Sequence, residues 1–151
     1  MNSSQVNPDP SVGSSPSLPR RRILLVDDNL NDQRLLRHVL TSANVDVTLE
    51  CNGQAAVDRI FCPRHSDNST FDLILMDLRM PLLDGCDATR ELRSGGYEGA
   101  IVIVTASEDD SVREAAFRAG CNDFLTKPVQ PSKLLDVVEK YAAAATTLPT
   151  D

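Results

Sequence analysis

Four short apolar runs in this chain each end in a polar residue that the packing of a buried strand does not need. The runs, with the polar residues that end them, are 23–26 with Asp27 and Asp28, 73–76 with Asp77, 101–104 with Thr105, and 124–126 with Lys127. Near-continuous apolar runs of this length are typical of strands buried on both faces, as in a parallel sheet. The carboxyl ends of parallel strands lie at one edge, where open α/β folds place their sites. The pattern therefore predicts an α/β fold with a polar site at that edge.

Strand and helix patterns alternate five times from residue 22 onward, which predicts a (βα)5 arrangement. The expected strands end at Asp27, Leu49, Asp77, Thr105 and Thr126. The expected helices cover about 30–42, a segment after Asn52 and Gly53, about 86–93, a segment ending at Ala119, and a segment that begins at Pro131. The second strand, 45–49, alternates in hydropathy as an edge strand does.

The length of 151 residues indicates one domain, which buries roughly 68–70% of its unfolded surface without needing disulfides or metals. We expect a disordered tail or linker at 1–20, a folded domain at 21–145 and a frayed end at 146–151. The formal net charge of −7 argues against direct binding of nucleic acid through a broad basic face. Because no apolar stretch approaches the ~20 residues of a membrane span, and the N-terminus lacks a signal-peptide core, we expect a cytoplasmic protein with no membrane contact.

Three carboxylates, a hydroxyl and an ammonium group are expected at the site edge. Two like charges about 4 Å apart repel by roughly 4 kcal/mol at an effective dielectric constant of 20, so Asp27, Asp28 and Asp77 favour a bound cation. A small, incomplete set of oxygen ligands favours Mg²⁺ (or Mn²⁺), which also takes phosphate oxygens. Lys127 adds a positive charge for anionic oxygens. Since no His or Cys lies at these strand ends, a carboxylate is the natural phosphoryl acceptor.

The chain from about residue 22 to 142 resembles the receiver domain of two-component response regulators, including the chemotaxis regulators. The resemblance rests on five motifs, which are Val26-Asp27-Asp28, Met76-Asp77-Leu78-Arg79-Met80-Pro81, Asp84-Gly85, Val104-Thr105-Ala106 and Thr126-Lys127-Pro128. It implies a three-layer, flavodoxin-like fold. In that fold a five-stranded parallel sheet in the order 2-1-3-4-5 has helices on both faces.

The resemblance also implies how the site residues divide the work of binding a metal. Asp77 would be the phospho-accepting aspartate and one metal ligand. Asp28 would bind Mg²⁺ directly, Asp27 would act mainly through water, and the backbone carbonyl of Arg79 would be a further ligand. The side chain of Arg79 would either influence how long the phosphoryl group persists or simply point to solvent.

The remaining motif residues would read the phosphoryl group. By resemblance, Thr105 would bond its oxygens, and Lys127 would pair first with Asp77 and then with the phosphoryl group. Phe124 matches the aromatic switch position and also suits a core role. The bond between Lys127 and Pro128 is similar to the usual cis peptide of the family.

The function implied is a phosphorylation switch that is not an enzyme beyond its own phosphorylation and dephosphorylation. A sensor histidine kinase or a histidine phosphotransfer protein would donate a phosphoryl group from phosphohistidine to Asp77. The new charge would then change the face between the fourth strand and the fifth helix, which a downstream output partner would recognise. The chain leaves open whether this is a stand-alone regulator or a part of a hybrid kinase.

Two other functions remain as alternatives to the switch. An aspartate-nucleophile phosphatase needs a second Asp two residues after the nucleophile, where this chain has Arg79. A receiver-like docking domain that is never phosphorylated would not need the complete set of site residues. His38 and His65 are interpreted as surface or half-packed imidazoles rather than as phosphotransfer histidines, because neither lies in a four-helix setting.

Overall fold

Five strands form one parallel sheet in the computed structural model, which describes residues 20–62 and 71–142. The strands are β1 (Arg21–Val26), β2 (Val45–Glu50), β3 (Leu73–Asp77), β4 (Ala100–Thr105) and β5 (Asp123–Thr126). Their spatial order is β2-β1-β3-β4-β5, which confirms the flavodoxin-like topology expected from the sequence. The described residues leave out 1–19 of the tail expected at 1–20, the loop at 63–70 with His65, the last three residues of the domain expected at 21–145, and the frayed end expected at 146–151.

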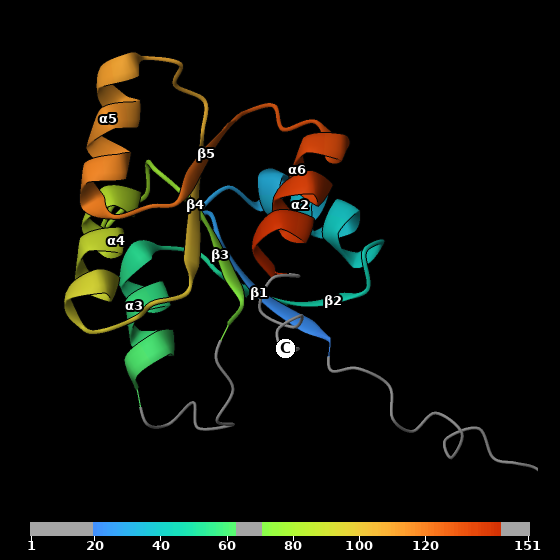
Figure 1. Cartoon of the computed structure of the whole chain (residues 1–151), viewed down its shortest axis with the longest axis horizontal. Helices are drawn as coiled ribbons and strands as arrows, with labels where there is room; N and C mark the ends of the chain where they lie inside the picture. Colours follow the sequence, from blue (N-terminus) through green and yellow to red (C-terminus); the bar gives the residue numbers. More distant parts are fainter. Residues whose placement is uncertain (1–19, 63–70, 143–151) are drawn as a thin grey trace, which may run out of the picture.

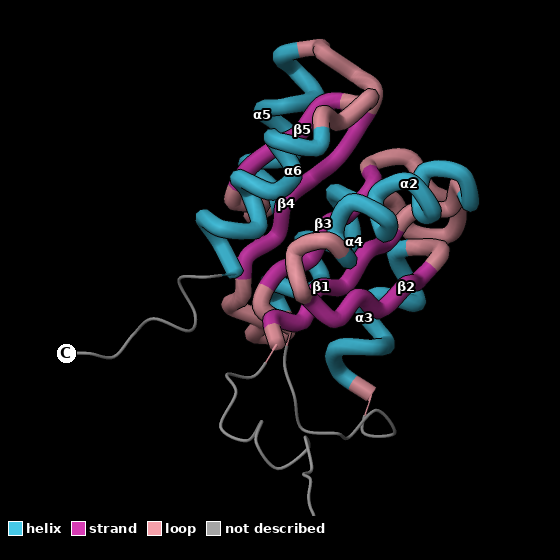
Figure 2. Tube along the Cα trace, turned by 90° about the vertical axis from the view of Figure 1, so that its right-hand side faces the viewer, coloured by secondary structure: helices cyan, strands magenta, loops and turns pink. Residues whose placement is uncertain are grey.

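Helices cover both faces of the sheet (Figure 1). They are α2 (Leu30–Thr41), α3 (Gly53–Phe61), α4 (Gly85–Ser94), α5 (Asp110–Ala119) and α6 (Pro131–Val137), which continues as the π-helical turn η2 (Val138–Ala142). Helices α3, α4 and α5 lie on one side of the strands and α2 and α6 on the other, and Figure 2 shows α2 and α6 in front of the sheet. None of the helices in the described part of the chain is long and apolar enough to cross a membrane.

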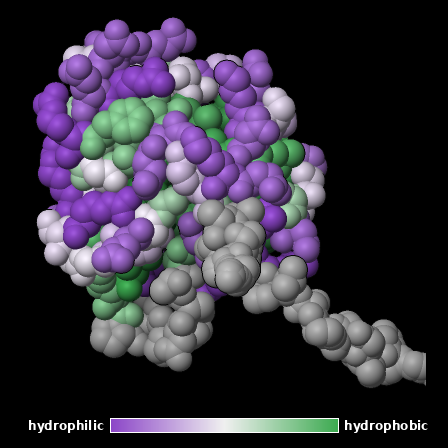
Figure 3. Space-filling model, in the orientation of Figure 1, coloured by the Kyte–Doolittle hydropathy of each residue, from purple (hydrophilic) through white to green (hydrophobic). Residues whose placement is uncertain are grey.

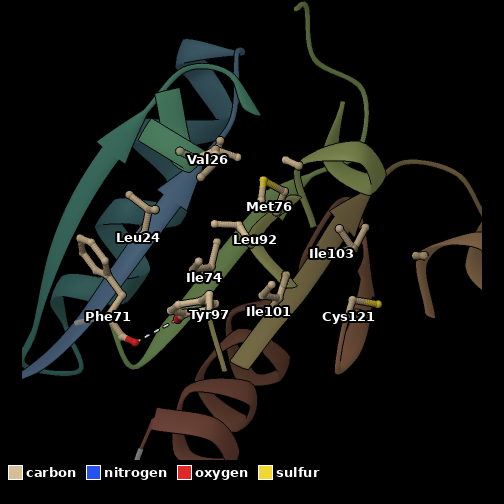
Figure 4. Packing of buried hydrophobic residues seen from close by; sticks show 14 of the residues in the cluster. Leu24, Val26, Phe71, Ile74, Met76, Leu92, Tyr97, Ile101, Ile103 and Cys121 are labelled. Carbon is tan, nitrogen blue, oxygen red and sulfur yellow. Dashed lines mark hydrogen bonds between the residues drawn. The ribbon is translucent and has the colours of Figure 1, made fainter. Parts of the chain in front are cut away.

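The alternation of side chains along each strand builds two separate cores. Leu24 and Val26 of β1 belong to the cluster that packs under α3, α4 and α5, whereas Ile23 and Leu25 belong to the cluster under α2 and α6. Figure 4 shows the first cluster, in which the Tyr97 hydroxyl donates a hydrogen bond to a backbone carbonyl. Burial of each large aliphatic side chain contributes about 1.5–3 kcal/mol to stability, so the two clusters together hold the helices on both faces of the sheet.

The last helix differs from the expected regular helix. Its final turn, η2, has π-helical rather than α-helical hydrogen bonding. A π-turn holds one more residue than an α-turn, and both Val138 and Ala142 stay buried through it. Hydropathy patterns of 3.6 residues per turn do not distinguish such a turn from an ordinary helix end, so the sequence did not predict it.

Four of the helices begin beside the carboxyl ends of the strands, each with a polar N-cap. Asn29, Asn52, Asp84 and Asp109 each accept a hydrogen bond from a backbone amide in the first turn of the helix that follows. Helix α4 begins so close to β3 that a Cβ atom on Gly85 would lie 2.4 Å from the backbone oxygen of Asp77. Glycine at this position therefore lets the chain turn directly behind the end of β3.

Candidate functional site

The three carboxylates predicted from the strand ends lie together. Asp77 is the last residue of β3, and Asp27 and Asp28 directly follow β1, its neighbour in the sheet. One carboxylate oxygen from each of the three lies within 4.8 Å of the other two. Asp27 is only 1% exposed and Asp77 8% exposed, whereas Asp28 is open to solvent. This geometry follows from the register of β1 and β3, which aligns Val26 with Met76.

A cavity of about 390 Å³ opens over these carboxylates. Its lining consists of Asp28, Asn29, Asp32, Asp77, Arg79, Thr105, Ala106, Ser107 and Lys127. The structure thus brings every predicted edge residue except the buried Asp27 to the wall of one cavity. The exposed side chain of Arg79 is part of that wall, and its influence on how long the phosphoryl group persists stays a prediction.

Lys127 lies among three carboxylates rather than against Asp77 alone. Its ammonium nitrogen is 2.7 Å from Oδ2 of Asp32, 3.0 Å from Oδ2 of Asp27 and 3.5 Å from Oδ2 of Asp77. The expected pairing with Asp77 is therefore present but is the longest of the three. Burial lowers the pKa of Lys127, but its hydrogen bonds to Asp32 and Asp27, with the charge of Asp77, hold that pKa above its usual range.

Asp77 is an unusual carboxyl group because its surroundings disfavour the ionised form. Burial, and next the negative charge of Asp27, raise the pKa of Asp77 from 3.8 to about 6, although the Lys127 ammonium acts in the opposite direction. One lysine thus compensates only part of the repulsion among the acidic groups. A divalent cation at this point would remove the remainder.

Thr105 and Phe124 lie on the neighbouring strands β4 and β5. The Thr105 side chain is 2% exposed, and its hydroxyl oxygen accepts a hydrogen bond from the backbone amide of Ser107. The Phe124 ring is buried in the core cluster, and the guanidinium carbon of Arg113 lies 5.2 Å from its centroid. The core role of Phe124 is therefore observed, while its switch role stays a prediction. The peptide bond between Lys127 and Pro128 is cis, as the motif implied.

Two residues that support the site were not singled out from the sequence. The side-chain amide nitrogen Nε2 of Gln33 donates hydrogen bonds to the backbone oxygens of Asp27, at 2.6 Å, and Glu50, at 3.3 Å, and so fixes the end of β1. The carboxylate of Asp32 makes the shortest contact to Lys127. Both are polar residues in the first turn of α2, directly after the acidic pair, and that position was the available sequence signal. The exposed His38 lies on the same helix but does not line the cavity.

The residues present fit a small divalent cation. Three carboxylate oxygens within 4.8 Å of one another are hard ligands, and the backbone of Arg79 follows two residues after Asp77. Such a set suits Mg²⁺ or Mn²⁺, which keep several water ligands and bind oxygen donors. Asp27, Asp28 and Asp77 could therefore hold the ion, with the open cavity leaving room for water.

Asp28→Ala is expected to weaken the binding of Mg²⁺ by about tenfold or more, since even residues outside a ligand set change metal affinity by that much. Asp28 is the exposed member of the carboxylate group, so its loss should leave the fold intact. The affinity can be measured by Mg²⁺ titration with NMR detection. Asp136→Ala removes one exposed carboxylate from α6 and serves as the control. An unchanged affinity in Asp28→Ala would contradict the assignment of this side chain as a ligand.

The sequence profile of the family described as "Response regulator receiver domain" matches residues 23–139. The chain belongs to this family. It is a receiver domain of a two-component or phosphorelay system. Curated relatives include two-component response regulator 24 of Arabidopsis thaliana, 36% identical over 117 residues, which cover 78% of this chain and 81% of the relative. The chemotaxis protein CheY of Thermotoga maritima is 30% identical over 123 residues, covering 81% of this chain and 98% of CheY.

Other relatives are much longer than this receiver domain. The osmosensing histidine protein kinase SLN1 of Saccharomyces cerevisiae is 34% identical over 125 residues. This match covers 82% of this chain but 10% of that kinase. Among solved structures, the receiver domain of sensor histidine kinase PA1611 from Pseudomonas aeruginosa PAO1 shares 35% identity with a TM-score of 0.71. The match covers 83% of this chain and all of that one, which has a magnesium ion coordinated in the active site cleft.

Proposed function

We propose that this receiver domain accepts a phosphoryl group on Asp77 in a Mg²⁺-dependent reaction. In the proposed step, a carboxylate oxygen of Asp77 forms a bond to the phosphorus of a phosphohistidine, and the nitrogen–phosphorus bond breaks. The imidazole leaves with the electron pair and takes up a proton. The observation that carries the proposal is that Asp77 lies at the wall of an open cavity, grouped with the carboxylates of Asp27 and Asp28 and 3.5 Å from the Lys127 ammonium.

The side chains of the cavity are suited to hold a transferring phosphoryl group. A bound Mg²⁺ or Mn²⁺ would neutralise charge on the phosphoryl oxygens and orient them. Asp27, Asp28 and Asp77, with the backbone carbonyl of Arg79, would be its ligands. The Lys127 ammonium lies 3.5 Å from Asp77 and can donate to a phosphoryl oxygen there. The Thr105 hydroxyl is at the same wall and would provide a further donor.

Phosphorylation would replace the single negative charge of the Asp77 carboxylate, at the end of β3, by a phosphoryl group of about −1.5 to −2, a net change of about −0.5 to −1. Thr105 ends β4, and its strand partner Thr126 directly precedes Lys127. Movement of Thr105 and Lys127 toward the new group would therefore reach β5 and its Phe124. We propose that the face between β4 and α6 changes in response and that an output partner recognises the change.

The proposed donor is a sensor histidine kinase or a histidine phosphotransfer protein. This receiver domain is similar to the receiver domain of Ssk1, solved as a complex with the histidine phosphotransfer protein Ypd1 of Saccharomyces cerevisiae. The two receiver chains share 28% identity with a TM-score of 0.73, over 89% of this chain and 97% of that one. We propose no activity on an external substrate, because Arg79 holds the position where an aspartate-nucleophile phosphatase needs its second acid.

Incubation with acetyl phosphate and Mg²⁺ is expected to add one phosphoryl mass to the protein, and a chelator should suppress the gain. The metal dependence is expected because the ionised Asp77 and its acidic neighbours repel an anionic donor unless a cation lies between them. Intact-protein mass spectrometry over a time course measures the rate of phosphoryl gain with Mg²⁺ and the rate with the chelator. A wild-type protein that gains no mass from acetyl phosphate, phosphoramidate or a phosphorylated histidine donor would rule out the proposed function.

A further inference from the structure

We infer that Asp32 is a positioning residue that holds the Lys127 ammonium away from Asp77 and thereby slows phosphorylation. The inference rests on the proposed function and adds a residue to it. Asp32 lies 95 residues before Lys127, yet their side chains make the shortest ion pair in which Lys127 takes part, at 2.7 Å. Asp77, the proposed acceptor, is 3.5 Å away, beyond the distance of a good charged hydrogen bond.

Asp32 is placed firmly by the start of α2. The side chain of Asn29 caps this helix by accepting the backbone amide of Asp32 at 3.0 Å, which fixes the residue in the first turn. From there the Asp32 carboxylate forms one wall of the site cavity. It is not a member of the carboxylate group that could share a metal ion among the residues the structure describes. Its partner in the site is therefore the lysine rather than the cation.

The three contacts of Lys127 differ in how easily they can be given up. An ammonium group has three donors, and a phosphoryl group on Asp77 would need at least one of them. Asp27 is 1% exposed, so loss of its lysine contact would leave a buried carboxylate without that partner. Asp32 is 36% exposed and can exchange the lysine for water. The contact to Asp32 is thus the one given up most easily when Lys127 moves toward Asp77.

This exchange makes Asp32 a competitor of the phosphoryl group for the same ammonium. Its carboxylate also adds negative charge to the cavity that an anionic phosphodonor must enter. Both effects act in the same direction, toward slower formation of the aspartyl phosphate. A purely structural ion pair between α2 and the end of β5 would instead affect stability and leave the rate unchanged.

The test compares Asp32→Asn with Asp58→Asn, each of which exchanges one carboxylate for an amide. Asp58 is exposed on α3 and is hydrogen-bonded to Gln54, away from the cavity. With acetyl phosphate, the Asp77 oxygen bonds to phosphorus, the phosphorus–oxygen bond breaks and acetate leaves. Asp32→Asn is expected to be phosphorylated about three- to tenfold faster than wild type, the range that corresponds to the net contribution of one partly exposed hydrogen-bonded ion pair. Asp58→Asn should match wild type.

Two further measurements separate positioning from structure. In a Lys127→Met background, the rate increase from Asp32→Asn should shrink, because the lysine for which Asp32 competes is gone. In ¹⁵N-lysine spectra without any phosphodonor, Asp32→Asn should shift the Lys127 ammonium signal and speed its proton exchange with water, and Asp58→Asn should not.

A wild type that gains no phosphoryl mass would overturn the proposed function together with this inference. If the wild type is phosphorylated, equal rates for Asp32→Asn and Asp58→Asn would overturn the inference alone. An undiminished rate increase in the Lys127→Met background would also overturn it, since the effect would then not pass through the lysine.

Discussion

Asp77→Asn is expected to abolish phosphoryl acceptance and, in the absence of Mg²⁺, to make the folded protein more stable at neutral pH. The amide cannot act as the nucleophile in the proposed step, so no mass gain should occur with acetyl phosphate. The same change removes one of three crowded carboxylates, two of which are almost completely buried. The crowded carboxylates thus lower the stability of the folded protein but are needed for the reaction, a trade-off that is common at functional sites.

The pH dependence of this gain in stability has a definite sign. The pKa of Asp77 is raised from 3.8 to about 6, so between these values the folded protein holds a proton that the unfolded chain has lost. Stability from this group therefore falls as the pH rises from about 4 to about 6, and a pKa displacement of this size corresponds to about 3 kcal/mol. Asp77→Asn does not undergo that loss. Its gain in stability over the wild type should therefore be absent below pH 4, grow between pH 4 and pH 6, and be complete above pH 6.

Chemical denaturation of both proteins in chelator, from pH 4 to pH 8, measures this difference. Asp58→Asn, with the same chemical change on an exposed helix position, should show no such pH-dependent gain. Saturating Mg²⁺ should stabilise the wild type more than the Asp77→Asn protein, because the ion relieves the same repulsion. A wild type that is as stable as Asp77→Asn at pH 8 without metal would contradict the crowding of charges described here.

Lys127→Met is expected to destabilise the metal-free protein by about 3 kcal/mol, because removing one partner of a buried ion pair leaves an uncompensated charge. Lys127 is 17% exposed and lies within 3.5 Å of three carboxylates, of which Asp27 is almost fully buried. Methionine keeps much of the length and apolar stem of the lysine, so the loss reports mainly on the charge. Mg²⁺ should recover part of the stability by supplying positive charge to the same group.

Denaturant unfolding with and without Mg²⁺ measures the effect, with Lys133→Met as the control on an exposed position of α6. Lys127→Met should still accept a phosphoryl group from acetyl phosphate. Its amide spectrum around β4, β5 and α6 should change little on phosphorylation, because the lysine that would follow the new group is absent. A full spectral response in this variant would remove Lys127 from the proposed switch.

The hydropathy pattern of the chain is sufficient to predict the strands, the edge at which the site lies and its main residues. Buried strands of a parallel sheet are near-continuous apolar runs, so Asp27, Asp77 and Thr105 were recognisable where such runs stop. Parallel strands align their carboxyl ends, and this local pattern was sufficient to predict that the three side chains meet. The order of the strands came from the resemblance of the motifs to the receiver family.

The partner that each side chain takes follows instead from how the helices and strands pack in the folded protein. The pairing of Lys127 with Asp32 joins residues 95 positions apart, and the stacking of Arg113 on Phe124 joins a helix to a strand. Such contacts depend on the distance between packed elements and on side-chain length, which no periodicity encodes. The strand ends thus brought Asp28, Asp77 and Lys127 to one cavity, and the first turn of α2, at the wall of the same cavity, placed Asp32 closer to the lysine than Asp77 is.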